Sequence, residues 1–225
     1  MRAYGFVGAG EITAAIVEGL SADVADPPAV FLSPRGRQIA HELAGRFPNA
    51  AVCANNQDVL DAASVLVLAV RPSVAREVLA ELEFRPDHVV LSAVAGVPLA
   101  SLREWTAPAE HVVRTIPLPQ AARLHSLTAL FPDHPVARDL FEPLGGVLVP
   151  PDEPTLDAFS AADAYVTHLF AQLGQSLGIA SLTELTAKHT TPGGINQQLM
   201  TALRHDGVPG SVRRGLDAVL ARLRE

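Results

Sequence analysis

The chain has 225 residues, of which 48% are hydrophobic, so it can form one large domain or a medium-sized domain followed by a small one. Its formal net charge of -7 at pH 7 and its sequence pI of about 5.6 argue against a nucleic-acid-binding face. The longest obvious apolar run, Val65 to Val70, is too short to cross a bilayer, and the single cysteine, Cys53, excludes a disulfide framework. We therefore expect a cytoplasmic protein with no nucleic-acid partner and no membrane partner.

The chain opens with a strand that starts at Tyr4 and a helix that follows the segment Gly8-Ala9-Gly10. Because glycine has no Cβ atom, Gly8 suits a sharp turn, and Gly10 would let a pyrophosphate approach the backbone. The start of the following helix favours bound anions. The third small residue of this fingerprint falls on Thr13, where Gly or Ala is expected. On these residues alone, a dinucleotide-binding turn and an ordinary strand-to-helix turn both remain open.

Strands and helices alternate over the first two thirds of the chain. The predicted strands cover 29–33, 63–70 and 88–94 and lie near 111–116 and 126–131, and the predicted helices cover 36–47 and lie near 73–82 and 99–105. This alternation predicts an α/β fold with a doubly wound parallel sheet. Beyond the proline pair at 150 and 151 only helical spacing remains. We therefore place a domain boundary there, with an α/β domain over 1–150 and a helical domain over 151–225.

The loop after the second predicted strand reads Ser33-Pro34-Arg35-Gly36-Arg37. Doubly wound sheets bind ligands beyond the carboxyl ends of their strands, and an NAD-preferring loop usually offers a carboxylate to the ribose hydroxyl. This loop has no carboxylate and offers two guanidinium groups that suit an extra phosphate. The loop therefore favours NADP (NADPH) over NAD. Two solvated arginines on a surface loop would give the same sequence pattern.

The eight histidines are scattered, and no pair or cluster of residues has metal-ligand spacing. We expect no metal site and no Ser/His/Asp or Cys/His nucleophile. His41, His88 and His111 are interpreted as surface or locally bonded histidines. Cys53 is interpreted as a small buried residue.

The segment HTTPGGINQQL, residues 189–199, is a candidate carboxylate site. Pro192 fixes the chain direction, and Gly193 and Gly194 expose N–H groups ahead of a helix. An anionic substrate group could accept hydrogen bonds from those N–H groups and from the Thr191 hydroxyl. A helix-to-helix turn with proline and glycine punctuation is the alternative.

Lys188 is the only lysine of the chain and lies beside that segment. A lysine with a lowered pKa can donate a proton at a ketone or alkoxide oxygen, whereas arginine cannot. This residue supports an alternative function, an NADP-dependent dehydrogenase of the β-hydroxyacid type. The other interpretation is a solvated lysine at a helix end.

An ordered set of segments, spread over nearly the whole chain, resembles pyrroline-5-carboxylate reductase. The segments are GFVGAGEITAAIVEGL (5–20), SPR (33–35), Asn56, LAVRP (68–72), VAGV (94–97), VRTIPLP (113–119) and TPGG (191–194). The resemblance implies a Rossmann-type doubly wound parallel sheet followed by a small all-helical dimerisation domain. It also implies a homodimer or higher homo-oligomer, and reduction of a small cyclic imine carboxylate to L-proline with NADPH or NADH.

The resemblance also implies site residues. It assigns cofactor binding to the loops that follow the strands, and substrate binding to the loop ahead of a helix in 151–225. The cofactor set is Gly8, Ala9, Gly10, Glu11, Ile12, Ser33, Arg35, Arg37, Asn56, Ala69, Val70, Arg71, Pro72, Ala95 and Gly96. The substrate set is Thr191, Gly193, Gly194 and Asn196, of which Thr191 and Asn196 are the candidate catalytic residues.

Three positions depart from the family pattern. Leu118 stands in a segment that lacks an amide and a hydroxyl of the family, and Asn196 replaces a residue with a hydroxyl group. Ala162 stands in a stretch where the family has glycines. The segment between Tyr165 and Thr183 is also shorter than the family pattern by something like one helical hairpin. These changes near the substrate support a third hypothesis, a dimer that binds NADP without catalysis.

Overall fold

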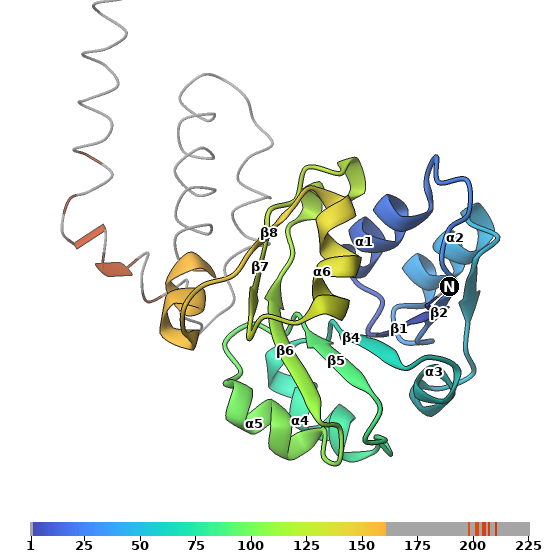
Figure 1. Ribbon diagram of the computed structural model, residues 1–225, viewed down its shortest axis with the longest axis horizontal. Coiled ribbons are helices and arrows are strands. Elements are labelled where there is room, and N and C mark those ends of the chain that lie inside the picture. The colour runs from blue at the N-terminus through green and yellow to red at the C-terminus, as the bar shows by residue number, and fades with distance from the viewer. Residues whose placement is uncertain are drawn as a thin grey trace, which may run out of the picture. The chain divides into compact units, whose positions relative to one another are not determined.

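The structure is a computed structural model, and it describes residues 2–160 and the separate positions 198, 201, 202, 204, 205, 207 and 210 (Figure 1). The chain divides into two compact units, Met1–Leu156 and Asp157–Glu225. The functional division at residue 150 stays a prediction. Several residues of the predicted substrate site and of its alternatives lie outside the described residues: Ala162, Lys188, Thr191, Gly193, Gly194 and Asn196.

The first unit is built around an eight-stranded sheet with the strand order β3-β2-β1-β4-β5-β6-β7-β8. The strands are β1 (Tyr4–Val7), β2 (Val30–Leu32), β3 (Ala50–Val52), β4 (Val65–Leu68), β5 (Val89–Ser92), β6 (His111–Ile116), β7 (Thr128–Phe131) and β8 (Val147–Leu148). The helices are α1 (Glu11–Ser21), α2 (Arg37–Arg46), α3 (Asn56–Ala62), α4 (Pro72–Ala80), α5 (Leu99–Trp105) and α6 (Pro135–Phe141). Two short 3-10 helices, η1 (Pro119–Arg123) and η2 (Glu142–Leu144), and a helical segment over residues 153–160 are also present. The predicted Rossmann-type α/β fold is confirmed.

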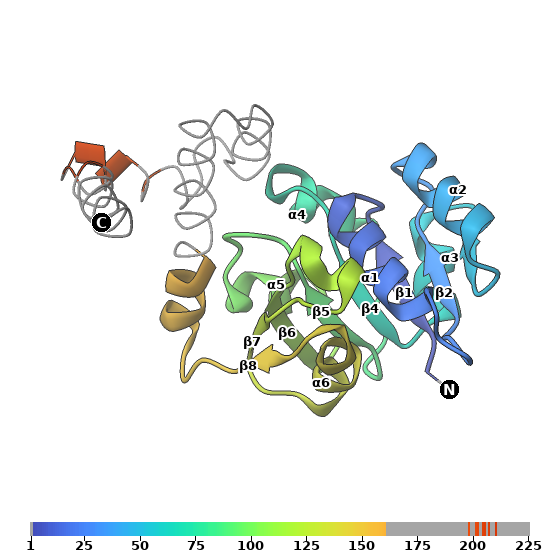
Figure 2. The ribbon, with the colours of Figure 1, turned by 90° about the horizontal axis from the view of Figure 1, so that it is seen from above.

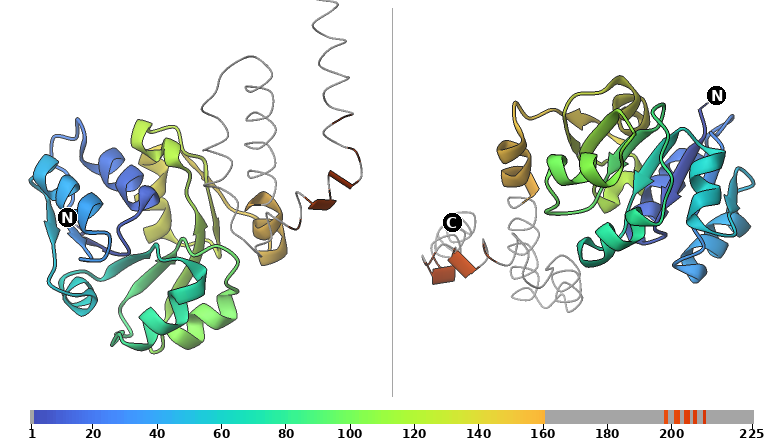
Figure 3. Two further views of the ribbon diagram at one scale, coloured as in Figure 1. Left: turned by 180° about the vertical axis from the view of Figure 1, so that it is seen from behind. Right: turned by 90° about the horizontal axis from the view of Figure 1, so that it is seen from below.

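Alternating side chains along the central strands supply both faces of the sheet. Tyr4 and Phe6 belong to one buried cluster together with α1, α2 and α6, whereas Val7 belongs to a second cluster with α3, α4 and α5. On β4, Val65 and Val67 join the first cluster and the intervening leucine joins the second. Helices therefore cover both faces of the sheet, as Figures 2 and 3 show.

The sheet is not wholly parallel, which corrects one expectation. Strands β1 to β6 run parallel, but β7 pairs antiparallel with β6, and β8 runs parallel to β7. The connection between β6 and β7, residues 117–127, contains only η1. A parallel return needs a crossover of about a dozen residues or more, usually an α-helix, so this short connection brings the chain back antiparallel.

Two short strands, β3 and β8, and two α-helices, α3 and α6, were missing from the sequence-based expectation, as were η1 and η2. Strand β3 is only Ala50–Val52 and has an exposed middle residue, so it gives almost no periodic signal. Helices α3 and α6 both begin with residues that favour a helix start. Asn55 Oδ1 accepts a hydrogen bond from the Asp58 N–H at 2.9 Å, and Pro135 occupies the first turn of α6.

Two absences concern the described residues only. No helix in this part of the chain is long and apolar enough to cross a membrane. Across the same residues, no group of three or more His, Cys, Asp or Glu side chains could hold a metal ion.

Two histidines meet where β6 begins and α6 starts. The ring centroids of His111 and His134 are 5.0 Å apart, and His134 Nδ1 accepts a hydrogen bond from the Val136 N–H at 3.2 Å, which caps α6. Burial lowers the pKa of His134, and the neighbouring His111 and Arg2 lower this pKa further, against an opposing effect of Asp133. Protonation of His134 would remove the acceptor that caps the helix.

The lowered pKa of His134 predicts a loss of stability in acid. The stability that neutral His134 contributes is fully present above the ordinary histidine pKa of 6.5. This stability is lost as the pH falls from 6.5 through the lowered pKa of His134 in the folded protein. Asparagine caps helices well and does not titrate, so His134→Asn should lose less stability between about pH 7.5 and about pH 5, by up to about 1 kcal/mol. Urea unfolding at both pH values measures this difference.

The control for this experiment is His125→Asn, which replaces an exposed histidine in the β6–β7 connection. This variant should follow the pH dependence of the parent protein. If His134→Asn also follows the parent, the capping histidine does not contribute to acid sensitivity.

Candidate functional site

The candidate site lies at the carboxyl edge of the parallel strands, where the strand order reverses between β1 and β4. The registers Phe6↔Leu32 and Val7↔Leu68 bring the ends of β2 and β4 level with the end of β1. Open α/β sheets bind ligands in the crevice outside such a reversal point. The loops that carry the predicted cofactor residues all begin at this edge.

Gly8 makes the turn after β1 and joins three loops. Its φ of 103° is in the left-handed region, and a Cβ atom there would come within 2.5 Å of the Ala69 carbonyl oxygen. The Gly8 N–H donates to Ser33 Oγ at 3.0 Å, and the Thr13 hydroxyl donates to the Gly8 carbonyl at 2.6 Å. The position therefore requires glycine, and the fully buried Thr13 holds the turn in place of the small residue expected there.

Gly10 has a different role from Gly8. It is the N-cap of α1 in an extended conformation, without a capping side chain, and a Cβ atom there would meet nothing within 4 Å. The space in front of the helix is therefore open at this point. Because backbone N–H groups of the first helical turn lack partners within the helix, this space suits an anionic group such as a phosphate.

The loops after β1 and β2 are packed together. Gly36 has a φ of 86° and is the N-cap of α2, and a Cβ atom there would collide with the Ala9 carbonyl oxygen. Ser33 is fully buried because its hydroxyl is used to hold Gly8. Arg35 and Arg37 are exposed, so their guanidinium groups are accessible at this end of the site.

A pocket lies beside Arg35. Its walls come from the loop after β2, the start of α3 and the end of α4. The lining residues are Pro34, Arg35, Ala54, Asn55, Asn56, Gln57, Glu81 and Leu82. The buried Oδ1 atom of Asn56 has no hydrogen-bond partner in the described structure. Since buried acceptors are normally paired, this atom fits a ligand that donates a hydrogen bond there.

The remaining predicted cofactor residues follow β4 and β5. Ala69 and Val70 lie against Gly8, Arg71 is the N-cap of α4, and Pro72 is its first residue. Ala95 and Gly96 are exposed in the loop after β5, where Gly96 has a φ of 70°. Glu11 is exposed in the first turn of α1, whereas Ile12 is half-buried against the core.

A buried arginine supports the loop after β5. Arg114 of β6 forms an ion pair with Glu153 at 2.6 Å, and the same carboxylate oxygen accepts the N–H of Leu99, the first residue of α5, at 2.6 Å. The Arg114 side chain is 6% exposed. Glu153 therefore connects β6 with the start of α5, which follows the loop that carries Gly96. Neither this arginine nor its partner was predicted from the sequence.

Leu118 departs from the resemblance at a described position. It is half-buried at the N-cap of η1, and its N–H donates to Ser126 Oγ at 3.1 Å. The backbone of this segment is thus held by a serine hydroxyl. The apolar side chain adds no polar group to the site.

Known proteins resemble this chain in sequence and fold. Residues 3–96 match the family described as NADP oxidoreductase coenzyme F420-dependent. The pyrroline-5-carboxylate reductase of Pseudomonas aeruginosa is 26% identical over 260 positions, which cover 98% of this chain and 95% of that protein. Since 260 positions exceed the 225 residues of this chain, the relative carries extra residues within the matched region.

Two solved structures share the fold. The 1-pyrroline-5-carboxylate reductase of Streptococcus pyogenes has a TM-score of 0.65 at 23% identity, covering 98% of this chain and 97% of that one. The pyrroline carboxylate reductase of Plasmodium falciparum, solved with NADP bound, has a TM-score of 0.65 at 16% identity, covering 98% of this chain and 96% of that one. Both therefore match the fold over nearly the full length.

The different environments of Gly8 and Gly10 predict different costs of substitution. Gly8→Ala forces a left-handed alanine against the Ala69 carbonyl and should lower the free energy of unfolding by about 3 kcal/mol or more. Gly10→Ala meets open space and should cost no more than about 1 kcal/mol. Urea unfolding monitored by circular dichroism measures both, with Gly45→Ala, on the open face of α2, as the control. Equal losses at positions 8 and 10 would contradict the assignment of the turn.

Proposed function

We propose that this chain, a member of the pyrroline-5-carboxylate reductase family, transfers a hydride from NADPH to a small cyclic imine carboxylate. The observation that carries the proposal is the Gly8 turn, which places open space in front of α1 at the point where the strand order reverses. Curated relatives with the reductase name support it, since one of them matches 98% of the chain. Pyrroline-5-carboxylate is the first candidate substrate, and L-proline is the corresponding product.

The described residues fit a dinucleotide. Gly10 and the first turn of α1 would hold the pyrophosphate, and Arg35 with Arg37 would hold the 2′-phosphate that distinguishes NADP from NAD. Asn56 would pair its orphaned oxygen with a donor on the adenosine end. The loops that contain Ala69, Val70, Arg71, Pro72, Ala95 and Gly96 would then run beside the ribose and nicotinamide. NAD remains the alternative cofactor.

The chemistry requires little from the side chains. When bound, NADPH supplies the hydride. The carbon of the C=N bond accepts it, while the protonated imine nitrogen keeps its proton and takes up the electron pair of the broken π bond. A protonated imine is already electrophilic, so the protein has to align the reactants and exclude water. No described side chain needs to act as a nucleophile.

Residues 151–225, for which the sequence predicts helices, would supply the substrate site and the dimer contact. We assign the substrate carboxylate to Thr191, Gly193 and Gly194, and place Asn196 beside the reacting atoms. A helical domain of this length would bury little apolar surface by itself, so we expect a second copy of the chain to cover the apolar stripes that the sequence predicts there. We place the protein in the cytoplasm as a homodimer.

The single cysteine fits a role away from the chemistry. Cys53 is half-buried, and burial, with a smaller effect of Asp58, raises the pKa of its thiol. A thiol with a raised pKa carries little thiolate at neutral pH, so it is a poor nucleophile. Cys53 is therefore a packing residue.

The reaction is tested by oxidation of NADPH with three substrates: pyrroline-5-carboxylate, its six-membered-ring analogue and a 3-oxo acid. We expect reduction of a cyclic imine carboxylate that survives Lys188→Ala and falls at least about ten-fold in Gly194→Val, which blocks the carboxylate loop. Because Leu118, Ala162 and Asn196 depart from the family pattern, the comparison of the two cyclic imines shows which of them is the better substrate.

The same assay separates the alternatives. Activity on the oxo acid alone, abolished by Lys188→Ala, would identify a dehydrogenase of the β-hydroxyacid type. Tight binding of NADPH without turnover of any of the three compounds would identify a non-catalytic dimer. Either result would contradict the proposed reductase.

Cofactor choice is tested at Arg35, which lines the pocket. Arg35→Ala should weaken NADPH binding by about 10- to 100-fold, because a charge-assisted hydrogen bond contributes about 1.5–3 kcal/mol, and should leave NADH binding nearly unchanged. Arg37→Ala should act in the same direction. Calorimetric titration gives both affinities, with the exposed Arg103→Ala on α5 as the control. Equal weakening of the two cofactors would remove the assignment of the 2′-phosphate site.

A further inference from the structure

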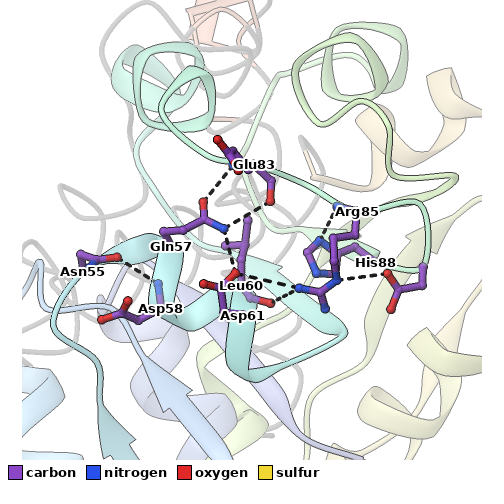
Figure 4. A network of polar contacts seen from close by, with 9 residues as sticks. Asn55, Gln57, Asp58, Leu60, Asp61, Glu83, Arg85 and His88 are labelled. Atoms are coloured by element: carbon purple, nitrogen blue, oxygen red, sulfur yellow. Dashed lines mark hydrogen bonds and ion pairs between the residues drawn. The ribbon is translucent and has the colours of Figure 1, made fainter.

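The side-chain amide of Gln57 forms a clasp with the backbone after α4 (Figure 4). Its Nε2 donates to the Glu83 carbonyl at 3.3 Å, and its Oε1 accepts the Glu83 N–H at 2.9 Å. The Nε2 group also donates to Asp61 Oδ1 at 3.0 Å, one turn further along α3. Both amide hydrogens and the carbonyl oxygen are therefore bonded to protein atoms.

This clasp connects two walls of the pocket beside Arg35. One wall consists of residues 54–57, at the start of α3, and the other consists of Glu81 and Leu82. Gln57 belongs to the first wall, and Glu83 directly follows the second. The two hydrogen bonds between Gln57 and Glu83 thus fix the separation of the walls.

A second set of contacts anchors the segment that follows Glu83. Arg85 Nη1 donates to the Leu60 carbonyl of α3 at 3.2 Å, and the Arg85 N–H donates to Nδ1 of the buried His88 at 3.1 Å. Arg85 also forms ion pairs with Asp61 at 4.0 Å and Asp87 at 3.2 Å (Figure 4). Helix α3 and residues 83–88 therefore form one polar network, and the prediction that His88 is locally bonded is confirmed.

The network holds the residues on either side of Asn56, a polar residue of the pocket. It lies between the capping residue Asn55 and the clasp residue Gln57, and its buried Oδ1 atom lacks a partner. Asn55 Oδ1 is bonded to the Asp58 N–H, so the residues on both sides of Asn56 have their side chains held by the protein. Asn56 also lines the pocket beside Arg35, so this network fixes the backbone that carries one of the polar residues of the pocket.

We propose that Gln57 is a positioning residue that sets the width of this pocket and so raises its affinity for the adenosine 2′-phosphate end of NADPH. The inference rests on the proposed function, since the ligand is the cofactor named there. A pocket whose walls are already fixed loses less conformational freedom on binding, and its affinity is correspondingly higher. Gln57 acts on the pocket indirectly, through its two hydrogen bonds to Glu83, because its own polar atoms are already bonded to Glu83 and Asp61.

The test uses adenosine 2′,5′-bisphosphate and NADPH as probes in calorimetric titrations of the full chain. Gln57→Ala should weaken both probes by about the same factor, on the order of ten-fold. Gln57→Met should weaken both as well, because methionine has no amide to bond Glu83 and adds no charge that would repel the phosphate of the probes. This second variant keeps the size of the side chain and covers the case in which Gln57→Ala does not fold.

Two further measurements separate positioning from general stability. Gln57→Met should raise the KM for NADPH with kcat unchanged, and its thermal midpoint should stay within about 3 °C of the parent. Gln38→Ala, an exposed glutamine on α2, is the matched control and should leave both affinities unchanged.

The outcomes are distinguishable from failure of the proposed function. If the parent protein binds both probes and neither Gln57 variant weakens them by more than about two-fold relative to Gln38→Ala, the positioning role is wrong and the cofactor assignment stands. If the parent binds neither probe, the cofactor assignment fails and the inference fails with it.

Discussion

The close approach of Gly8 to the Ala69 carbonyl is the constraint on which the candidate site depends. The turn needs a left-handed backbone and leaves no room for a Cβ atom. Its two backbone polar groups are bonded to Ser33 and Thr13, so the loops after β1, β2 and β4 are held by one residue. Because these contacts are made inside the protein, α1 begins at a fixed place with open space in front of Gly10.

Two kinds of contact hold the candidate site together: close backbone packing in one part and side-chain hydrogen bonds in the other. Around the turn, close-packed backbone fixes the loops, as Gly36 against Ala9 illustrates. At the Arg35 pocket, a polar network replaces close packing, since Asn55 and Gln57 each bond to backbone and leave Asn56 with a free acceptor. This division agrees with a ligand that presents a pyrophosphate at one point and a nucleoside at the other.

The sequence predicted the parts of the fold that carry periodic patterns. Buried β4 was predicted from its run of β-branched residues, and the turn at Gly8 was predicted because an apolar run ended at glycine. The arginines after β2 indicated a phosphate site. Short β3 gave no such pattern, and the reversal at β7 depends on connection length rather than on periodicity. In the sequence, Thr13 was a mismatch to the small residue that the fingerprint expects. Its hydrogen bond to Gly8 is seen only in the structure. Gln57 was missed for the same reason, since its partner Glu83 is far along the chain.

The central claim is that the cofactor binds at the carboxyl edge assembled around Gly8. Amide hydrogen exchange of the full chain, followed by mass spectrometry with and without NADPH, tests it most directly. Slower exchange with NADPH is expected in the loops that begin at this edge, in residues 8–13, 33–37, 54–57 and 69–72. Exchange that is unchanged there, or slowed only around 132–139 where α6 begins, would contradict the account.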